Sequence, residues 1–320
     1  MKKVTVFGGG TGLSCLLSGL KLFPVDVTAV ITVSDNGSST GVLKEELDIP
    51  AVGDVGKVLL SMANVDDDFV QLLRYRFNKE GSFLHNHPVR NILLAALIDL
   101  KGNLTEATRY MCQILNIKGT VLPLTEERVD LIGTSNDHRE EFFGEEAVSQ
   151  NIRNIARLRY DHIFRVSGEV KRRIAESDLI LFSPGSLYTS ILPHLIVEDI
   201  VKAIRDSYAP IMYVSNLVTQ PGETDGYNVS DHLRVLNDHL RGRKVDLVLA
   251  NDAQIDPQII SRYLMTENKT IVRLDRDKID ALGAKIIEGD IFTVDDAGSI
   301  RHNALKTAFL IFSYLMEQEK

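Results

Sequence analysis

Glycines follow the first apolar run of the chain in the pattern of a phosphate-binding loop. Residues 4–7 read Val-Thr-Val-Phe, and residues 8–12 read Gly-Gly-Gly-Thr-Gly. Glycines permit positive φ in a tight turn and let backbone N–H groups approach a phosphate at the start of a helix. The dinucleotide fingerprint G-x-G-x-x-G fits Gly8 and Gly10, but Leu13 stands at its third glycine. The added threonine hydroxyl favours a diphosphate or nucleotide-sugar site, with contacts expected from Gly9, Gly10, Thr11 and Gly12.

A second polar loop follows the apolar run 27–33 and reads Ser-Asp-Asn-Gly-Ser-Ser over 34–39. Asp35 can accept from a ribose hydroxyl or hold a divalent cation, and Asn36 can read a base edge. The same residues also stabilise a turn into a capped helix without any ligand. Because ligands of open α/β sheets bind beyond the carboxyl ends of the strands, we expect contacts from Asp35, Asn36, Gly37, Ser38 and Ser39.

Two later loops follow buried strand candidates at 179–182 and 211–214. The first carries Pro-Gly-Ser ahead of a hydroxyl-rich helix start, which is a second candidate anion site. It lacks the second glycine of a nucleophile elbow. The second loop, 216–227, is polar throughout and long, as binding loops and lids tend to be. The expected site residues of these loops are Pro184, Gly185, Ser186, Asn216, Thr219 and Gln220.

Strand and helix patterns alternate along most of the chain, which predicts a Rossmann-like, doubly wound, mostly parallel α/β sheet. Nothing in the composition marks a linker, so we expect a single domain over 1–320 with a helical insertion at about 54–115. Further strands are expected at 4–7 and 245–250. Helices are expected at 89–100, 104–115, 197–207, 229–241 and 303–317.

Composition limits the classes of partner. The 320 residues carry a net charge of −8, which argues against general binding to nucleic acid or anionic lipid but leaves a local basic pocket open. No apolar stretch reaches the length of about 18 residues that a membrane span requires. The absence of a signal-peptide pattern and the unpaired spacing of Cys15 and Cys112 predict a cytoplasmic protein. His85 and His87 are a weak metal pair without a third ligand nearby, and no catalytic triad is evident.

Five segments together resemble the YvcK family of gluconeogenesis factors, relatives of the CofD phosphotransferases. The stretch Thr-Gln-Pro-Gly-Glu-Thr-Asp-Gly at 219–226 points to the YvcK branch in particular. The resemblance extends over nearly the whole chain. The segments that carry it are 7–12, 34–43, 121–125, 184–191 and 216–225.

The resemblance implies a protein that binds nucleotide sugars of the UDP-N-acetylglucosamine type and needs no further cofactor. It also implies a regulatory link from carbon metabolism, especially gluconeogenic growth, to cell-wall precursor synthesis and cell shape. The implied partner is an enzyme of amino-sugar or cell-wall precursor synthesis, and a homo-oligomer stays open. Carried over by position, Tyr263 would stack on the base and Arg301 would pair with the diphosphate, while no catalytic residue is implied.

Two alternatives stay open. One is a CofD-like phosphotransferase that uses a nucleoside-diphosphate-linked donor, with a divalent cation held by Asp35. The other is a protein that binds an NAD-type dinucleotide, since Asp35 lies about 20 residues after the glycines, where an acidic residue holds the ribose.

The sequence departs from the family's usual motifs at two places. Residues 51–56 read Ala-Val-Gly-Asp-Val-Gly where the family usually shows Pro-Pro-Gly-Asp-Ile-Arg, so a cation is lost at Gly56. In the motif His-x-x-Gly-Asn, Arg90 stands in place of the glycine between His87 and Asn91. The first change removes an expected phosphate contact, for which Lys57 is a substitute point charge.

Overall fold

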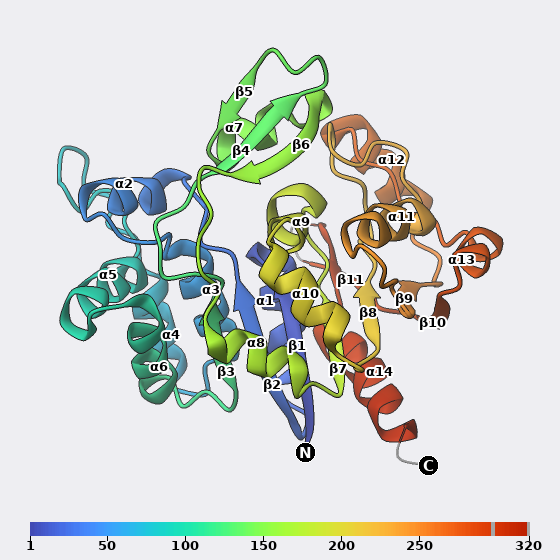
Figure 1. Ribbon diagram of the computed structural model, residues 1–320, viewed down its shortest axis with the longest axis horizontal. Helices are drawn as coiled ribbons and strands as arrows, with labels where there is room; N and C mark the ends of the chain where they lie inside the picture. Colours follow the sequence, from blue (N-terminus) through green and yellow to red (C-terminus); the bar gives the residue numbers. More distant parts are fainter. Residues whose placement is uncertain (296–297, 319–320) are drawn as a thin grey trace.

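A seven-stranded sheet forms the centre of the fold (Figure 1), in the order β10-β9-β8-β7-β1-β2-β3. The computed structural model describes residues 1–295 and 298–318. Each pairing in this sheet is parallel. The strands are β1 (Lys2–Gly8), β2 (Val25–Ile31), β3 (Thr120–Pro123), β7 (Leu179–Phe182), β8 (Ile211–Val214), β9 (Leu247–Asn251) and β10 (Lys285–Gly289).

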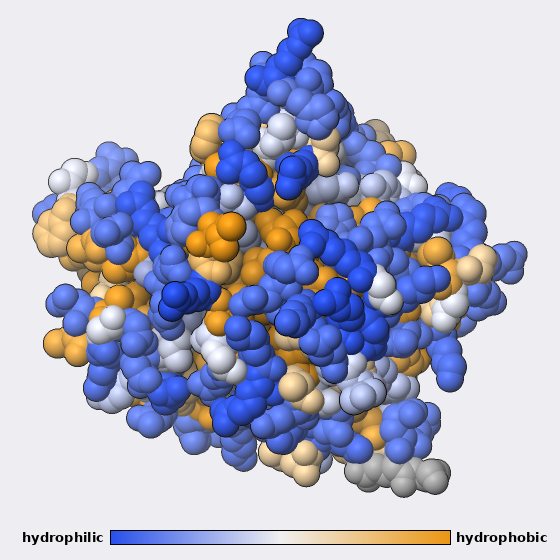
Figure 2. Space-filling model, viewed as in Figure 1, coloured by the Kyte–Doolittle hydropathy of each residue, from blue (hydrophilic) through white to orange (hydrophobic). Residues whose placement is uncertain are grey.

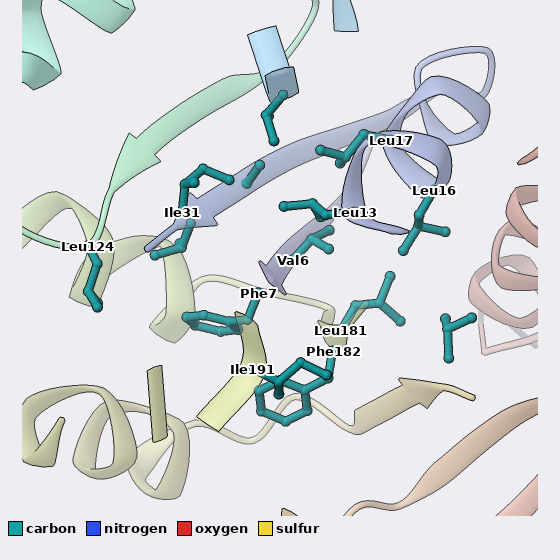
Figure 3. Close-up of a cluster of buried hydrophobic side chains, with 14 of the residues drawn as sticks. Val6, Phe7, Leu13, Leu16, Leu17, Ile31, Leu124, Leu181, Phe182 and Ile191 are labelled. Carbon is teal, nitrogen blue, oxygen red and sulfur yellow. The ribbon is translucent and has the colours of Figure 1, made fainter. Parts of the chain in front are cut away.

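The central strands are buried on both faces, which is why they read as continuous apolar runs rather than as alternating ones. All four residues of β7 and all four of β8 are buried. Phe7 of β1 lies against Phe182 of β7, with ring centroids 5.7 Å apart. Figure 3 shows these rings beside Leu13 and Leu181 in the core that joins the sheet to the first helix.

The sheet reverses its direction of winding at β1. From β1 the chain moves to β2 and β3 on one side, whereas β7 returns to the other side of β1 and continues through β8 to β10. The loops after β1 and β7 therefore leave neighbouring strands in opposite directions. In open α/β sheets such a switch point is where a crevice forms and ligands bind.

Helices cover both faces of the sheet. α1 packs on α3 and α14 behind the sheet, while α8 and α10 pack together in front of it (Figure 1). The segment between β2 and β3 is mostly helical and carries α2 to α6. The helices are α1 (Gly10–Leu20), α2 (Ser38–Glu46), α3 (Gly53–Met62), α4 (Asp67–Arg74), α5 (Val89–Lys101), α6 (Leu104–Ile114), α7 (Glu145–Gln150), α8 (Gly168–Ala175), α9 (Leu192–Leu195), α10 (Glu198–Asp206), α11 (Val229–His239), α12 (Pro257–Glu267), α13 (Arg276–Leu282) and α14 (Ala304–Glu317).

A second, antiparallel sheet stands above the carboxyl edge of the first (Figure 1). We call it the small sheet; its order is β5-β4-β6, and helix α7 packs on it. Its strands are β4 (Leu131–Ser135), β5 (Glu141–Phe143) and β6 (Ile155–Tyr160). The hairpin of β11 (Phe292–Val294) and β12 (Ile300–His302) precedes α14.

The predicted fold class is confirmed: the main sheet is parallel, doubly wound and Rossmann-like, with helices on both sides. The predicted strands and helices are present, with ends displaced by no more than two residues.

Candidate functional site

The two glycine-containing loops at the switch point pack directly on each other. Gly10 adopts φ +63°, a left-handed conformation that favours glycine. A Cβ atom on Gly12 would overlap the carbonyl oxygen of Pro184. The loop after β1 and the loop after β7 therefore touch at their backbones at the switch point, the position where open α/β sheets form their ligand crevice.

The first turn of α1 presents backbone donors at this crevice. Gly9 precedes the helix without a side-chain cap, and no acidic residue lies in the first turn. Among the described residues, no protein group accepts from the N–H groups of Thr11 and Gly12. The N–H of Gly10 donates to Asp54 Oδ2 at 3.0 Å. The helix start thus has free backbone donors of the kind that bind anions, and one of its donors is occupied by the protein's own carboxylate.

Carboxylates gather next to that helix start around one lysine. Lys57 donates to Asp54 Oδ1 at 2.8 Å. Burial tends to lower the pKa of Lys57, but Asp54, then Asp35 and Glu145, outweigh it and raise the pKa overall. Burial, and then the charges of Asp35 and Asp54, raise the pKa of Glu145 to about 8. Glu145 opens α7, so the small sheet contributes a carboxyl group to the crevice.

The Asp35 loop holds its own turn and also anchors the small sheet. Asp35 Oδ1 accepts from the N–H of Gly37 at 2.9 Å, as in an Asx turn. Asn36 Oδ1 accepts from the N–H of Glu146 at 3.0 Å, and a Cβ on Gly144 would overlap the Asn36 amide. The Asn36 amide therefore docks α7 in this structure rather than facing an open base site.

Ser38 and Ser39 are held from the segment that precedes α5. Asn86 Nδ2 donates to Ser38 Oγ at 2.8 Å. Ser39 is buried, and its Oγ lies 2.8 Å from His87 Nδ1 and accepts from Asn91 Nδ2 at 3.3 Å. His87 thus has a hydroxyl partner, and within the part of the chain that the structure describes no three His, Cys, Asp or Glu side chains group to hold a metal ion.

A carboxylate also occupies the second predicted anion site. Ser186 Oγ donates to Glu223 Oε1 at 2.8 Å, and the N–H of Tyr188 donates to the same oxygen at 2.8 Å. Burial raises the pKa of Glu223, while these donors act in the opposite direction. The start of the π-helical turn η2 (Leu187–Ile191) is therefore capped by the loop after β8.

Two further predicted residues of that loop, Asn216 and Thr219, have internal partners. Asn216 Oδ1 accepts from the N–H of Gly185 at 2.9 Å, and its Nδ2 donates to the carbonyl of Gly185 at 2.8 Å. Thr219 is buried and its Oγ1 accepts from the N–H of Thr270. Gln220 keeps a buried Oε1 without a partner among the described residues. Asn216 thus fixes the shape of the Gly185 loop by using both polar atoms of its amide.

Tyr263 and Arg301, the two C-terminal residues that the family resemblance implies as ligand contacts, lie in different surroundings. Tyr263 is only 4 % exposed, and its hydroxyl accepts from the N–H of Ile300 at 2.6 Å. Its ring offers no open face for a base in this structure. Arg301 lies on β12, pairs with Asp295, and acts electrostatically on Cys15 of α1. Arg301 therefore lies near Cys15 of α1, and Tyr263 lies in the core.

Asp54, Asp225 and His232 are titratable residues near the loops, and each has a separate structural partner. Asp225 pairs with Arg153 at 2.7 Å and accepts from the N–H of Gly222 at 3.0 Å. His232 is buried, its Nδ1 lies 2.9 Å from the carbonyl of Asn228, and burial lowers its pKa. Asp54 accepts from the N–H of Gly10. Among the described residues, no hydrogen bond or ion pair joins Asp54, Asp225 and His232 to one another.

The structure connects the two departures from the family motifs. A Cβ built on Gly56 would lie 3.1 Å from Cδ and 3.4 Å from Cγ of Arg90. The side chain of Arg90 therefore runs over the space that a side chain at position 56 would enter.

A cavity of about 730 Å³ lies apart from the glycine loops, between β6 and the helices α9 to α11. Its apolar floor includes Leu192, Ile196 and Val235. Figure 2 shows hydrophobic residues gathered below the small sheet on this face. None of the predicted site residues lines this cavity.

Sequence reasoning missed Glu145 and Glu223 as members of the site. Glu145 stands about 110 residues from Asp35, and only the docking of the small sheet brings it to the crevice. Glu223 lay inside the polar loop 216–227, but nothing local marked it as the partner of Ser186. A useful signal was present at Gly144-Glu145, where a glycine directly precedes an acidic helix start.

These features define the class: a Rossmann-like α/β protein with paired glycine loops at the switch point of its sheet. The chain belongs to the CofD family, because the family model described as 2-phospho-L-lactate transferase CofD matches residues 4–292. It is 38 % identical to the gluconeogenesis factor of Halalkalibacterium halodurans, over 96 % of this chain and 94 % of that one. It is 39 % identical to the gluconeogenesis factor of Bacillus subtilis, over 98 % of each chain.

Solved structures agree with this placement. A crystal structure of a Bacillus halodurans protein superposes with a TM-score of 0.91 at 39 % identity, covering 97 % of this chain and 99 % of that one. The predicted membership in the YvcK branch of gluconeogenesis factors is confirmed. In the described residues, no helix is both long and apolar enough to cross a membrane.

Proposed function

We propose that this chain binds a nucleotide sugar of the UDP-N-acetylglucosamine type at the switch point between β1 and β7. In the proposal it acts in the cytoplasm as a regulator that links gluconeogenic carbon metabolism to cell-wall precursor synthesis and cell shape. The observation that supports it best is the start of α1, where the N–H groups of Thr11 and Gly12 have no protein acceptor among the described residues. Uncapped helix starts at such positions favour diphosphates.

In this proposal, a diphosphate replaces a carboxylate that binds at the start of α1 in the ligand-free protein. Asp54 holds both the N–H of Gly10 and the ammonium of Lys57. A diphosphate that takes the N–H of Gly10 displaces the Asp54 carboxylate and pairs with Lys57 instead. The proposed site thus exchanges an internal anion for the ligand's anion, and it needs no resident cofactor.

Regulation requires that occupancy be transmitted to a partner, for which an enzyme of amino-sugar or cell-wall precursor synthesis is our candidate. Two contacts of the small-sheet region support this step. Glu146 contacts Asn36 in the loop after β2. Arg153 contacts Asp225 in the loop after β8. A ligand that moves either loop changes the docking of the small sheet, whose outer surface a partner can contact.

Calorimetric titration with UDP-N-acetylglucosamine tests the proposal. The key variant is Thr11→Val, which keeps the shape of the side chain and removes its hydroxyl. We expect about a tenfold weaker affinity, since a hydrogen bond to a charged group contributes roughly 1.5 kcal/mol. Thr266→Val is the matched control on α12, where the hydroxyl bonds only to the carbonyl of Arg262. The absence of heat at millimolar ligand would refute the proposal, and tighter binding of NAD⁺ would favour a dinucleotide instead.

A CofD-like phosphotransferase is the second candidate, supported by the family match and by Glu145. A half-buried carboxyl group with a pKa of about 8 beside the glycine loop is suited to proton transfer near neutral pH. The described side chains do not converge as a metal-coordination set, and Asp35 is engaged by Gly37. We therefore assign no step to a cation. Turnover of a nucleoside-diphosphate-linked donor that is lost in Glu145→Gln would favour this candidate over regulation.

A further inference from the structure

Arg90 is a buried cation without a counter-charge. It lies in the first turn of α5 and is 7 % exposed. Among the described residues it forms no ion pair and no hydrogen bond, and its Nε is fully enclosed without a partner. Buried charges in proteins are normally paired, because an uncompensated one is costly to remove from water. The chain therefore maintains an unfavourable group at this position.

Two further arginines are held beside Arg90 by backbone pairing. The N–H of Val89 donates to the carbonyl of Tyr75 at 3.0 Å, and the N–H of Phe77 donates to the carbonyl of His87 at 3.3 Å. These bonds align the chain at 74–77 with the chain at 87–90. Arg74 and Arg76 are exposed on this strip, and neither pairs with a carboxylate within the described residues. Three guanidinium groups thus share one region without an acid to neutralise them.

Two like charges act on the guanidinium of Arg90. Burial, and then the charges of Arg76 and Arg74, lower the pKa of Arg90 to about 10. No carboxylate of the crevice contributes to that shift, although Asp35 and Asp54 act strongly on Lys57 one residue beyond Gly56. The charges that act on Arg90 are therefore those of Arg76 and Arg74, while its side chain lies against Gly56 of α3.

We propose that Arg90, Arg74 and Arg76 form a binding site for a phosphate-type oxyanion. Guanidinium groups offer paired N–H donors that match phosphate oxygens, and three cations suit a doubly charged ligand. Binding supplies the counter-charge that Arg90 lacks. The net charge of −8 for the whole chain disfavours a nucleic acid as the source of the phosphate. The ligand is thus free phosphate or the phosphomonoester of a small metabolite.

Thermal unfolding tests this site with three additives at matched ionic strength: sodium chloride, inorganic phosphate and glucose 6-phosphate. We expect phosphate to raise the melting temperature of the unaltered protein by about 2–4 °C relative to chloride. In Arg90→Met the melting temperature in chloride should rise, because the uncompensated charge is gone, and the response to phosphate should disappear. Arg205→Met, on the exposed face of α10, is the matched control and should retain the full response.

Each outcome bears on the proposal. A larger shift with glucose 6-phosphate than with phosphate assigns a phosphomonoester, and an equal shift assigns the free ion. If Arg90→Met melts lower in chloride and still responds to phosphate, the proposal is wrong. Arg74→Gln, on an exposed side chain, keeps the test valid if Arg90→Met does not fold: it must weaken the response. Titration with UDP-N-acetylglucosamine should be unchanged in Arg74→Gln, so this site and the proposed function can fail independently.

Discussion

Two buried cations in this chain, Lys44 on α2 and Arg90 on α5, have opposite surroundings. Lys44 is 2 % exposed, and its ammonium lies 2.6 Å from Asp130 Oδ1 and 2.6 Å from the carbonyl of Val129. Arg90 is almost as deeply buried and has no protein acceptor among the described residues. Burial alone therefore does not separate a structural charge from a ligand-binding one. The separating feature is whether the chain itself supplies the counter-charge.

The crevice shows the same distinction with carboxylates. Asp54 has Lys57 and the N–H of Gly10 as partners, whereas Glu145 lies among like charges that raise its pKa. Compensated groups such as Lys44 and Asp54 stabilise the fold. Crowded groups such as Glu145 and Arg90 stay costly until a proton or a ligand relieves them.

The largest expected effect is at Lys44. Lys44→Met should lower the free energy of unfolding by about 2–3 kcal/mol, because it leaves Asp130 without its cation and removes a bond to Val129. This loss is smaller than for a fully buried pair because the Asp130 side chain is 31 % exposed. Urea unfolding in chloride measures the change, with Lys202→Met at an exposed position of α10 as control. A loss no larger than that of the control would break the comparison with Arg90.

The fold could be predicted because its signals are local. β2, β7 and β8 read as continuous apolar runs, and the helix over 229–239 carries an Asn228 and Asp231 capping box. Strand β10 was not predicted, because it is only partly buried and two of its five residues are exposed. The three short strands of the small sheet depend on pairing with each other, so no single segment marks them.

The candidate site was only partly predictable, because side-chain roles depend on distant partners. The loops after β1, β2, β7 and β8 were identified from their residue types, and the parallel sheet places all of them at one edge. The use of Asn36 to dock α7 and of Asn216 to hold Gly185 was not visible in the sequence. Arg90 appeared only as a departure from a motif, and its lack of a partner is a property of the folded chain.

The intermediate effect is the pH dependence caused by Glu145. Its pKa is raised from about 4.5 in the unfolded chain to about 8 in the folded one, so the folded state holds a proton that the unfolded state releases. Stability from this group is present below pH 4.5 and is lost as the pH rises toward 8, by up to about 1.4 kcal/mol per pH unit. In Glu145→Gln the free energy of unfolding should therefore fall less between pH 6 and 7.5 than in the unaltered protein.

Urea unfolding at the two pH values measures this difference, which we expect to be about 2 kcal/mol or less. Glu146→Gln changes the exposed neighbouring carboxylate and should follow the unaltered protein. Parallel behaviour of Glu145→Gln and the unaltered protein would mean that Glu145 is not crowded by Asp35 and Asp54.

The smallest expected effect on the free energy of unfolding is at an exposed ion pair. Arg241 pairs with Glu198 at the surface, where both side chains are more than half exposed. Arg241→Gln should change the free energy of unfolding by no more than about 0.5 kcal/mol, because water and salt screen such a pair. Urea unfolding at low and high sodium chloride should show even this small difference vanish at high salt. A salt-resistant loss above about 1 kcal/mol would mean that exposure does not set the strength of ion pairs here, and that Lys44 and Arg90 cannot be compared through burial and counter-charge alone.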